Sequence, residues 1–172
     1  MSSGGHNEAK FKAAIISLSN SELWDEAKAE WRLHFVYDDP TDRSCECDHS
    51  PIHQICVIQN RKNSNITEVG NVCVRRFLRL LSNRIFAVIR RVRGEIRNSL
   101  NPKALELFRE RGVISSTEEA EYNEYWRKRT TLTEAQWAQK LDINRRVLSY
   151  VDTETKRLIE RASALGLKLR AA

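Results

Sequence analysis

The sequence predicts a mainly α-helical protein with one small β element, an α+β chain. Apolar residues recur at helical spacing along most of its 172 residues. Between Pro51 and Gly70, β-branched residues flank a polar turn, which is typical of a β-hairpin. All four cysteines fall between Cys45 and Cys73, around that hairpin. These features predict a cysteine-bearing hairpin module followed by a helical C-terminal half.

The composition is that of a folded chain. Hydrophobic residues make up 41% of it, with only three prolines and six glycines, so we expect a packed core. No apolar run approaches the roughly 18 to 20 residues that cross a bilayer, and the N-terminus lacks the pattern of a signal peptide. We therefore expect a cytoplasmic protein with reduced thiols. We divide it into two regions, residues 1–98 and 99–172.

The first elements follow from a change of period. Residues 9–18 and 23–31 carry apolar side chains at helical spacing, and the polar residues 19–21 separate the two segments. From Trp31 to Tyr37 the pattern alternates every second residue, which predicts that the second helix runs into a strand. Residues 38–42 then break the strand.

The hairpin comes next. Residues 52–59 and 66–69 form its strands, and residues 60–65 form its turn. A helix is expected from Val72, and Ser82 and Asn83 can cap a second one.

Capping signals place the later helices. Asn101 followed by Pro102 starts a helix that Gly112 ends. Capping boxes then start two more, one with Ser115 and Glu118 or with Ser116 and Glu119, the other with Thr133 and Gln136.

The cysteine stretch predicts a zinc site, because zinc prefers four tetrahedral sulfur and nitrogen ligands. Cys45 and Cys47 would lie on a knuckle, and Cys73 in the first turn of the helix after Gly70. We assign His49 as the fourth ligand because it continues the every-second-residue spacing, with His53 and Cys56 as contenders. The alternative is reduced cysteines that pack as small core residues, which suits Cys56 between two apolar neighbours.

The spacing Cys45-x-Cys47-x-His49, followed by Val69-Gly70-x-x-Cys73 and Phe77, resembles a set of small phage and prophage proteins. The resemblance covers about residues 31–80. It implies a treble-clef-like zinc site and no established activity. Asp48 stands where a glycine is common in that set.

A nuclease motif offers a minor alternative. Asp48-His49-x-Pro51, followed by asparagines at 60, 63 and 65, is similar to the opening of HNH nucleases, in which a histidine activates water beside a divalent metal. No histidine follows His53, so only Asn71 could supply the closing ligand. We therefore expect binding rather than catalysis.

The positive charge is concentrated in one segment. Residues 75–97 contain eight arginines and a single acidic residue, Glu95. Such a segment is suited to phosphate or to an acidic partner. The candidate nucleic-acid contacts in it are Arg75, Arg76, Arg79, Arg84, Arg90, Arg91, Arg93 and Arg97.

Residues 132–151 resemble the helix-turn-helix of the phage Cro and repressor family. The matching features are a small Ala138 between the helices, Ile143 in the turn and Asn144 as a cap. The resemblance implies that the second helix enters the major groove, with DNA contacts from Asn144, Arg145, Arg146 and Ser149. The alternative is one continuous helix whose buried stripe is Trp137, Leu141, Leu148 and Val151.

The sequence thus predicts a zinc-stabilised nucleic-acid-binding protein of phage or mobile-element type. DNA is favoured over RNA, and a regulatory role over catalysis. The alternative is an adaptor, or an inhibitor of a host factor, that binds an acidic protein surface through the same arginines and Trp24, Trp126 and Trp137. No membrane or small-molecule partner is evident from the sequence.

Overall fold

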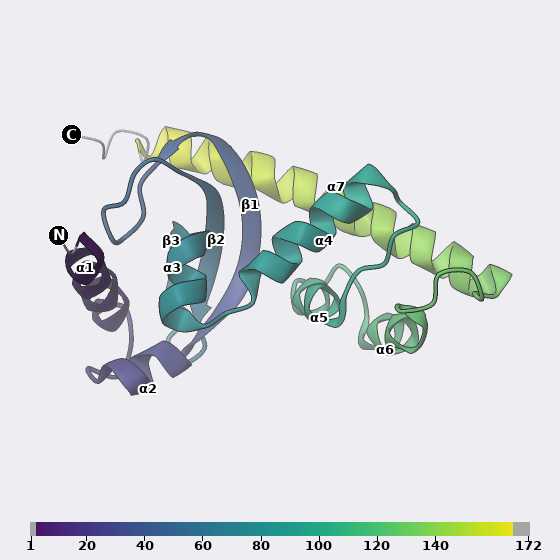
Figure 1. The fold of residues 1–172 in the computed structure, drawn as a ribbon, viewed down its shortest axis with the longest axis horizontal. Coiled ribbons are helices and arrows are strands. Elements are labelled where there is room, and N and C mark those ends of the chain that lie inside the picture. Colours follow the sequence, from purple (N-terminus) through teal and green to yellow (C-terminus); the bar gives the residue numbers. More distant parts are fainter. Residues whose placement is uncertain (1–2, 167–172) are drawn as a thin grey trace. The chain divides into compact units, whose positions relative to one another are not determined.

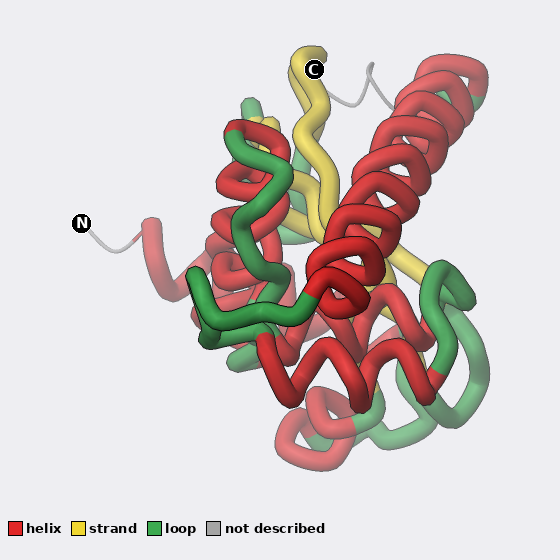
Figure 2. The backbone as a smooth tube through the Cα atoms, turned by 90° about the vertical axis from the view of Figure 1, so that its right-hand side faces the viewer, coloured by secondary structure: helices red, strands yellow, loops and turns green. Residues whose placement is uncertain are grey.

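The computed structural model describes residues 3–166, which divide into two compact units. Unit 1 comprises residues 3–82 and 157–166, and unit 2 comprises residues 83–156. The expected class is confirmed, because helices predominate and the strands form one small sheet (Figures 1 and 2). The unit boundaries fall after Ser82 and after Lys156, whereas the sequence suggested a single boundary after residue 98.

Unit 1 is built on a three-stranded antiparallel sheet in the order β1-β2-β3 (Figure 1). Its register places Cys56 opposite Val36 on one side and Val69 on the other. The predicted hairpin is confirmed as β2 and β3, and the predicted strand from Trp31 is longer than expected and pairs with β2. The strands are β1 (Trp31–Arg43), β2 (Ile52–Asn60) and β3 (Ile66–Gly70).

Short helices complete this unit before the boundary. Phe11 of the first helix is fully buried, and its ring lies 5.2 Å from that of Phe77, measured between centroids. The helix after β3 changes to a π-helical turn and ends at Arg79, whose backbone is left-handed (φ 58°). The elements are α1 (Ser3–Ser17), α2 (Trp24–Ala29), α3 (Asn71–Cys73) and the π-helical turn η1 (Val74–Leu78).

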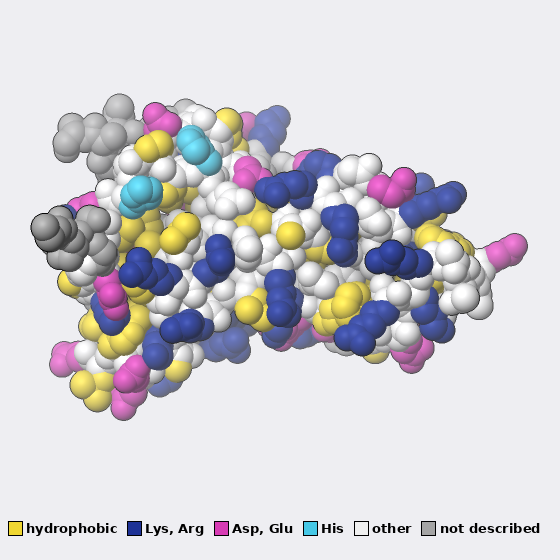
Figure 3. Space-filling view, viewed as in Figure 1, with side chains coloured by type: hydrophobic (Ala, Val, Ile, Leu, Met, Phe, Trp, Pro, Cys, Tyr) yellow, Lys and Arg dark blue, Asp and Glu magenta, His cyan; other side chains and the backbone are white. Residues whose placement is uncertain are grey.

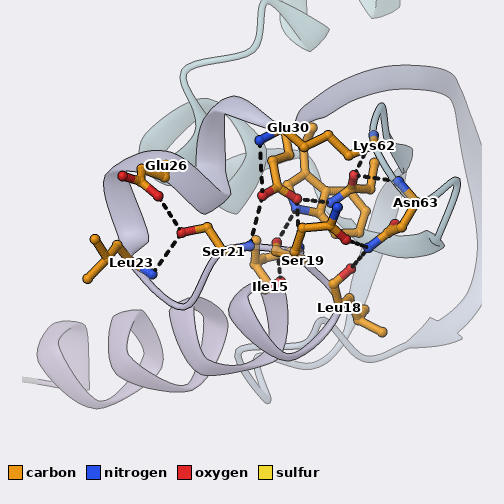
Figure 4. A network of polar contacts seen from close by, with 12 residues as sticks. Ile15, Leu18, Ser19, Ser21, Leu23, Glu26, Glu30, Lys62 and Asn63 are labelled. Atoms are coloured by element: carbon orange, nitrogen blue, oxygen red, sulfur yellow. Dashed lines mark hydrogen bonds and ion pairs between the residues drawn. The ribbon is translucent and has the colours of Figure 1, made fainter.

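A buried carboxylate joins the loop after α1 to the hairpin turn (Figure 4). Glu30 is 2% exposed and accepts hydrogen bonds from the backbone amides of Asn20 and Ser21 and from the side-chain amide of Asn60. The bond from Asn60 is the main cause that lowers the pKa of Glu30. Glu30 therefore serves as a polar tie within unit 1.

Unit 2 consists of helices and the loops that join them. The Oδ1 atom of Asn101 accepts from the amide of Ala104 at 2.9 Å, and Ser115 with Glu118 forms the predicted reciprocal box. Thr133 and Gln136 form the second box. These capping predictions are therefore confirmed. The helices are α4 (Ser82–Gly94), α5 (Pro102–Glu110), α6 (Ser116–Tyr125) and α7 (Glu134–Ala164), the last of which ends in unit 1.

The helix-turn-helix prediction is wrong, because α7 is one unbroken helix (Figure 1). Asp142 is exposed on the helix surface and Ile143 is fully buried. Ile143, Val147 and Val151 form an apolar stripe at intervals of four residues, which favours continuation of the helix over a turn. The continuous-helix alternative is correct, although Trp137, Leu141 and Leu148 are only half-buried.

Of the four residues that this motif placed toward DNA, two, Asn144 and Arg146, form contacts within unit 2. Asn144 is fully buried; its amide nitrogen donates to the carbonyl oxygens of Ile96 (2.7 Å) and Asn98 (2.8 Å), and its oxygen accepts from the Tyr122 hydroxyl (2.8 Å). Arg146 forms an ion pair with Glu118 of α6. The side chains at positions 145 and 149 remain exposed.

None of the helices between residues 3 and 166 combines the length and the apolar character that a bilayer-spanning helix needs.

Candidate metal centre

Three of the four cysteines meet in unit 1. The Sγ atoms of Cys45, Cys47 and Cys73 all lie within 4.8 Å of one another, and those of Cys47 and Cys73 are 3.4 Å apart. All three side chains are buried. Two come from the loop after β1 and the third from α3, as the sequence predicted. This group is close enough to hold a metal ion.

A tight turn positions the first two cysteines. The amide of Asp48 donates to the carbonyl of Cys45 (2.9 Å), and the amide of Cys45 donates to the carbonyl of His49 (3.0 Å). Asp48 adopts the left-handed backbone (φ 66°) that a glycine would adopt more readily. Aspartate tolerates this conformation better than most residues, so the turn forms without a glycine.

The sulfur of Cys45 is surrounded by hydrogen-bond donors. The amide of Gly70 donates to it at 3.2 Å, the amide of Cys47 also donates to it, and the sulfur of Cys73 lies within hydrogen-bonding reach. The bond from Cys73 is the largest cause that lowers the pKa of Cys45 to about 6. Burial raises the pKa of Cys47, and the hydrogen bond with Cys45, together with burial, raises the pKa of Cys73. The backbone donors thus favour the thiolate form of Cys45.

Cys56 does not belong to this group. It is fully buried in β2, and its Sγ atom lies 3.9 Å from the Oδ1 atom of Asn71. Burial raises the pKa of its thiol to about 12. Cys56 therefore behaves as the small core residue of the alternative reading, and its candidacy as a metal ligand is not supported.

Neither candidate histidine lies within the cysteine group, but both line the cavity beside it. The cavity has a volume of about 450 Å³, and its wall includes the three cysteines, His49, His53, Arg76 and Phe77. Both histidines are exposed, and the Nδ1 atom of His53 lies 3.0 Å from the carbonyl oxygen of Asp39. His49 follows Cys47 by two residues in the sequence, whereas His53 lies on β2.

The asparagines of the nuclease motif have structural roles instead. The Oδ1 atom of Asn60 accepts from the amides of Lys62 and Asn63, and Asn65 donates to the carbonyl of Leu18. Asn71 bonds with Gln54 and Ser82. Asn60, Asn63 and Asn65 therefore do not support a nuclease site with His49, whereas Asn71 lines the same cavity as His49.

The eight candidate arginines between residues 75 and 97 are all exposed. Arg93 is held by an ion pair with Asp152 (2.7 Å), and Arg91 donates to the carbonyl of Ser99 (2.9 Å). Among the described residues, no acidic side chain pairs with Arg84 or Arg90. Lys and Arg side chains gather over the region of the surface where α4 lies (Figure 3).

Sequence reasoning missed one basic residue, Lys140 of α7, which is only 2% exposed. Its one local signal was Trp137, three residues earlier and therefore on the same face of a helix.

Comparisons of this chain with protein-family models, with curated proteins and with solved structures gave no match.

Proposed function

We propose that this chain is a zinc-stabilised nucleic-acid-binding protein, with DNA favoured over RNA. The observation that carries the proposal is the arginine-rich segment of residues 75–97, whose basic side chains are all exposed. Two of them, Arg84 and Arg90, pair with no acidic side chain among residues 3–166. Phosphate groups are the natural counter-charge for such a surface.

The face of α4 has the form that backbone recognition needs. Ile85, Val88 and Val92 are buried on one side, whereas Arg84 and Arg91 lie two helical turns apart on the exposed side. At 1.5 Å per residue this separation is about 10 Å along the axis. Ala87, between them, leaves the ridge low enough for a phosphate backbone to approach.

Zinc suits the cysteine group because thiolates and imidazole are its preferred ligands. Cys45, Cys47, Cys73 and His49 would hold it, after rotation of the His49 side chain toward the three sulfur atoms. The ion would neutralise three clustered sulfur atoms and fix the loop after β1 to α3. Its role would be structural, since the group joins the hairpin to the helix that carries Arg75, Arg76 and Arg79.

Two histidine variants test the fourth ligand. His49→Ala should weaken zinc binding by more than the roughly 10- to 100-fold that loss of an outer-shell partner costs. His53→Ala is the matched control, because it lines the same cavity and should leave the affinity unchanged. Competition with a chromophoric chelator measures both. Equal effects of the two variants would reject His49 as a ligand.

Binding to labelled duplex DNA and duplex RNA, followed by fluorescence anisotropy at two salt concentrations, tests the main proposal. Affinity should fall steeply with salt, and Arg84→Gln or Arg90→Gln should reduce the log–log salt slope by about 1 each. Arg93→Gln is the control on the same helix, because Asp152 already neutralises that arginine. Absence of binding at low salt would refute the proposal.

A second candidate is a protein adaptor or inhibitor. Val72 is 67% exposed and Leu81 is 43% exposed, and they bracket the basic residues at 75, 76 and 79. A surface of mixed apolar and basic character suits an acidic protein partner. Loss of DNA binding in every condition above, with an intact fold, would favour this candidate.

A further inference from the structure

Lys140 is unusual because its side chain is almost completely buried. Its residue is 2% exposed on α7, and its ammonium lies 5.1 Å from the ring centroid of Trp137. Lysine is almost never fully buried unless it has a charged partner. The surroundings of this side chain therefore matter.

Those surroundings are basic. Burial lowers the pKa of Lys140, and the positive charge of the Arg91 guanidinium lowers it further. The guanidinium of Arg97 lies 5.9 Å from the centroid of the same Trp137 ring. We call these four residues, Arg91, Arg97, Trp137 and Lys140, the Lys140 cluster; all belong to unit 2.

No carboxylate offsets this charge among residues 3–166. None of the three basic side chains forms an ion pair there. Glu95 accepts from the backbone amide of Arg97, and Glu121 accepts from Gln139. The indole face of Trp137 compensates a cation only in part, so the cluster lacks an anion.

We propose that the Lys140 cluster binds a phosphate group. Phosphate has several oxygens that can take hydrogen bonds from an ammonium and two guanidinium groups at once, and arginine binds it in bidentate fashion. Arg91 and Arg97 are exposed, so the group would enter from solvent on their side. Trp137, half-buried beside it, offers an apolar surface to a sugar or base.

The phosphate could come from a nucleic-acid backbone or from a free phosphate or nucleotide. The backbone source rests on the proposed function, and the free source does not. Two arms separate them: titration of the purified chain with inorganic phosphate at constant ionic strength, and titration with a short labelled oligonucleotide. The Trp137 indole resonance reports on the site in both arms.

Lys140→Met removes the charge and keeps a similar length, and the matched control is Lys103→Met, an exposed lysine of α5. Loss of a charge-assisted hydrogen bond should weaken phosphate binding about tenfold or more in Lys140→Met and leave the control unchanged. Arg97→Gln, on the exposed side, should weaken it too. This second variant keeps the test valid if Lys140→Met unfolds.

The outcomes separate the two proposals. Equal binding of phosphate and oligonucleotide by Lys140→Met, Arg97→Gln and the parent chain would overturn the site while leaving nucleic-acid binding intact. Phosphate binding that shifts the Trp137 resonance, without any oligonucleotide binding, would support the site and refute the proposed function. Failure of the parent chain to bind either ligand would refute both.

Discussion

At the scale of single residues, Cys45 shows how a backbone can surround one sulfur with donors. Two backbone amides donate to its Sγ atom, and the Cys73 sulfur lies beside it. Such donors favour the thiolate over the thiol. These neighbours come from the knuckle, from the end of β3 and from α3. The surroundings of the Cys45 sulfur therefore form only when all three segments are correctly folded.

Replacing Cys73 should remove the metal. A serine hydroxyl stays protonated at neutral pH and is a poor zinc ligand, so Cys73→Ser should reduce the zinc content from about one equivalent to less than half. Elemental analysis of protein purified without chelator measures this.

Cys56→Ala is the control for that experiment. It should keep its zinc and lose only about 1 kcal/mol of stability through the small cavity left in the core. Full zinc content in Cys73→Ser would contradict the assignment of Cys73.

The clustering of Cys45, Cys47 and Cys73 could be predicted because knuckle spacing and a helix start are local features of the chain. For Cys56 the sequence left two roles open, since a buried core cysteine and a buried ligand look alike in sequence. Only the register of β2 with β1 and β3 placed its thiol beside Asn71 rather than in the group.

At the scale of elements, α7 shows why a motif can mislead. Caps and turns depend on a few adjacent residues, so the ends of α5 and α6 were predictable from Asn101 and Ser115. A helix-turn-helix also needs a turn between its two helices. The buried apolar stripe through Ile143 and Val147 favours one continuous helix instead. Polar Asn144 seemed a surface contact only because its partners are distant in sequence.

Replacing Asn144 should therefore affect stability rather than recognition. Asn144→Ala removes the acceptor of the Tyr122 hydroxyl and the donor to two backbone carbonyls, which should cost about 2 to 4 kcal/mol. Chemical denaturation followed by circular dichroism measures the loss.

Arg145→Ala, the exposed neighbour, should change the free energy of unfolding by less than about 0.5 kcal/mol. Similar small losses in both variants would mean that the buried network contributes little.

The link between α6 and α7 should depend on pH. The hydrogen bond from Arg146 is the largest cause that lowers the pKa of Glu118 in the folded protein. The resulting stabilisation is present above the unfolded pKa, near 4.3, and is lost as pH falls through the lower folded pKa. Because the pair is partly exposed, it should be worth less than about 1 kcal/mol.

Thermal unfolding should show this window. Glu118→Gln should lower the melting temperature at pH 7, and the difference from the parent chain should shrink between about pH 5 and pH 3. A difference that stays constant over that range would show that charge at Glu118 is not the cause.

At the scale of the whole molecule, the two units should respond differently to loss of metal. The cysteine group belongs to unit 1 alone. A chelator should therefore speed amide exchange in β2 and β3 by at least tenfold, while amides of α5 and α6 keep their protection. Hydrogen exchange with mass spectrometry measures both units in one sample. Equal deprotection of both would mean that they unfold as one.

The division of the chain also bears on its biosynthesis. Unit 1 consists of two stretches with the whole of unit 2 inserted between them, and α7 carries the buried residues Leu158 and Ala162 into unit 1. As the chain leaves the ribosome, the inserted unit can finish folding first. The cysteines are synthesised before residues 157–166, so the core of unit 1 stays incomplete until those residues follow. During that interval a bound metal ion would hold the loop after β1 to α3 and so stabilise the newly made hairpin.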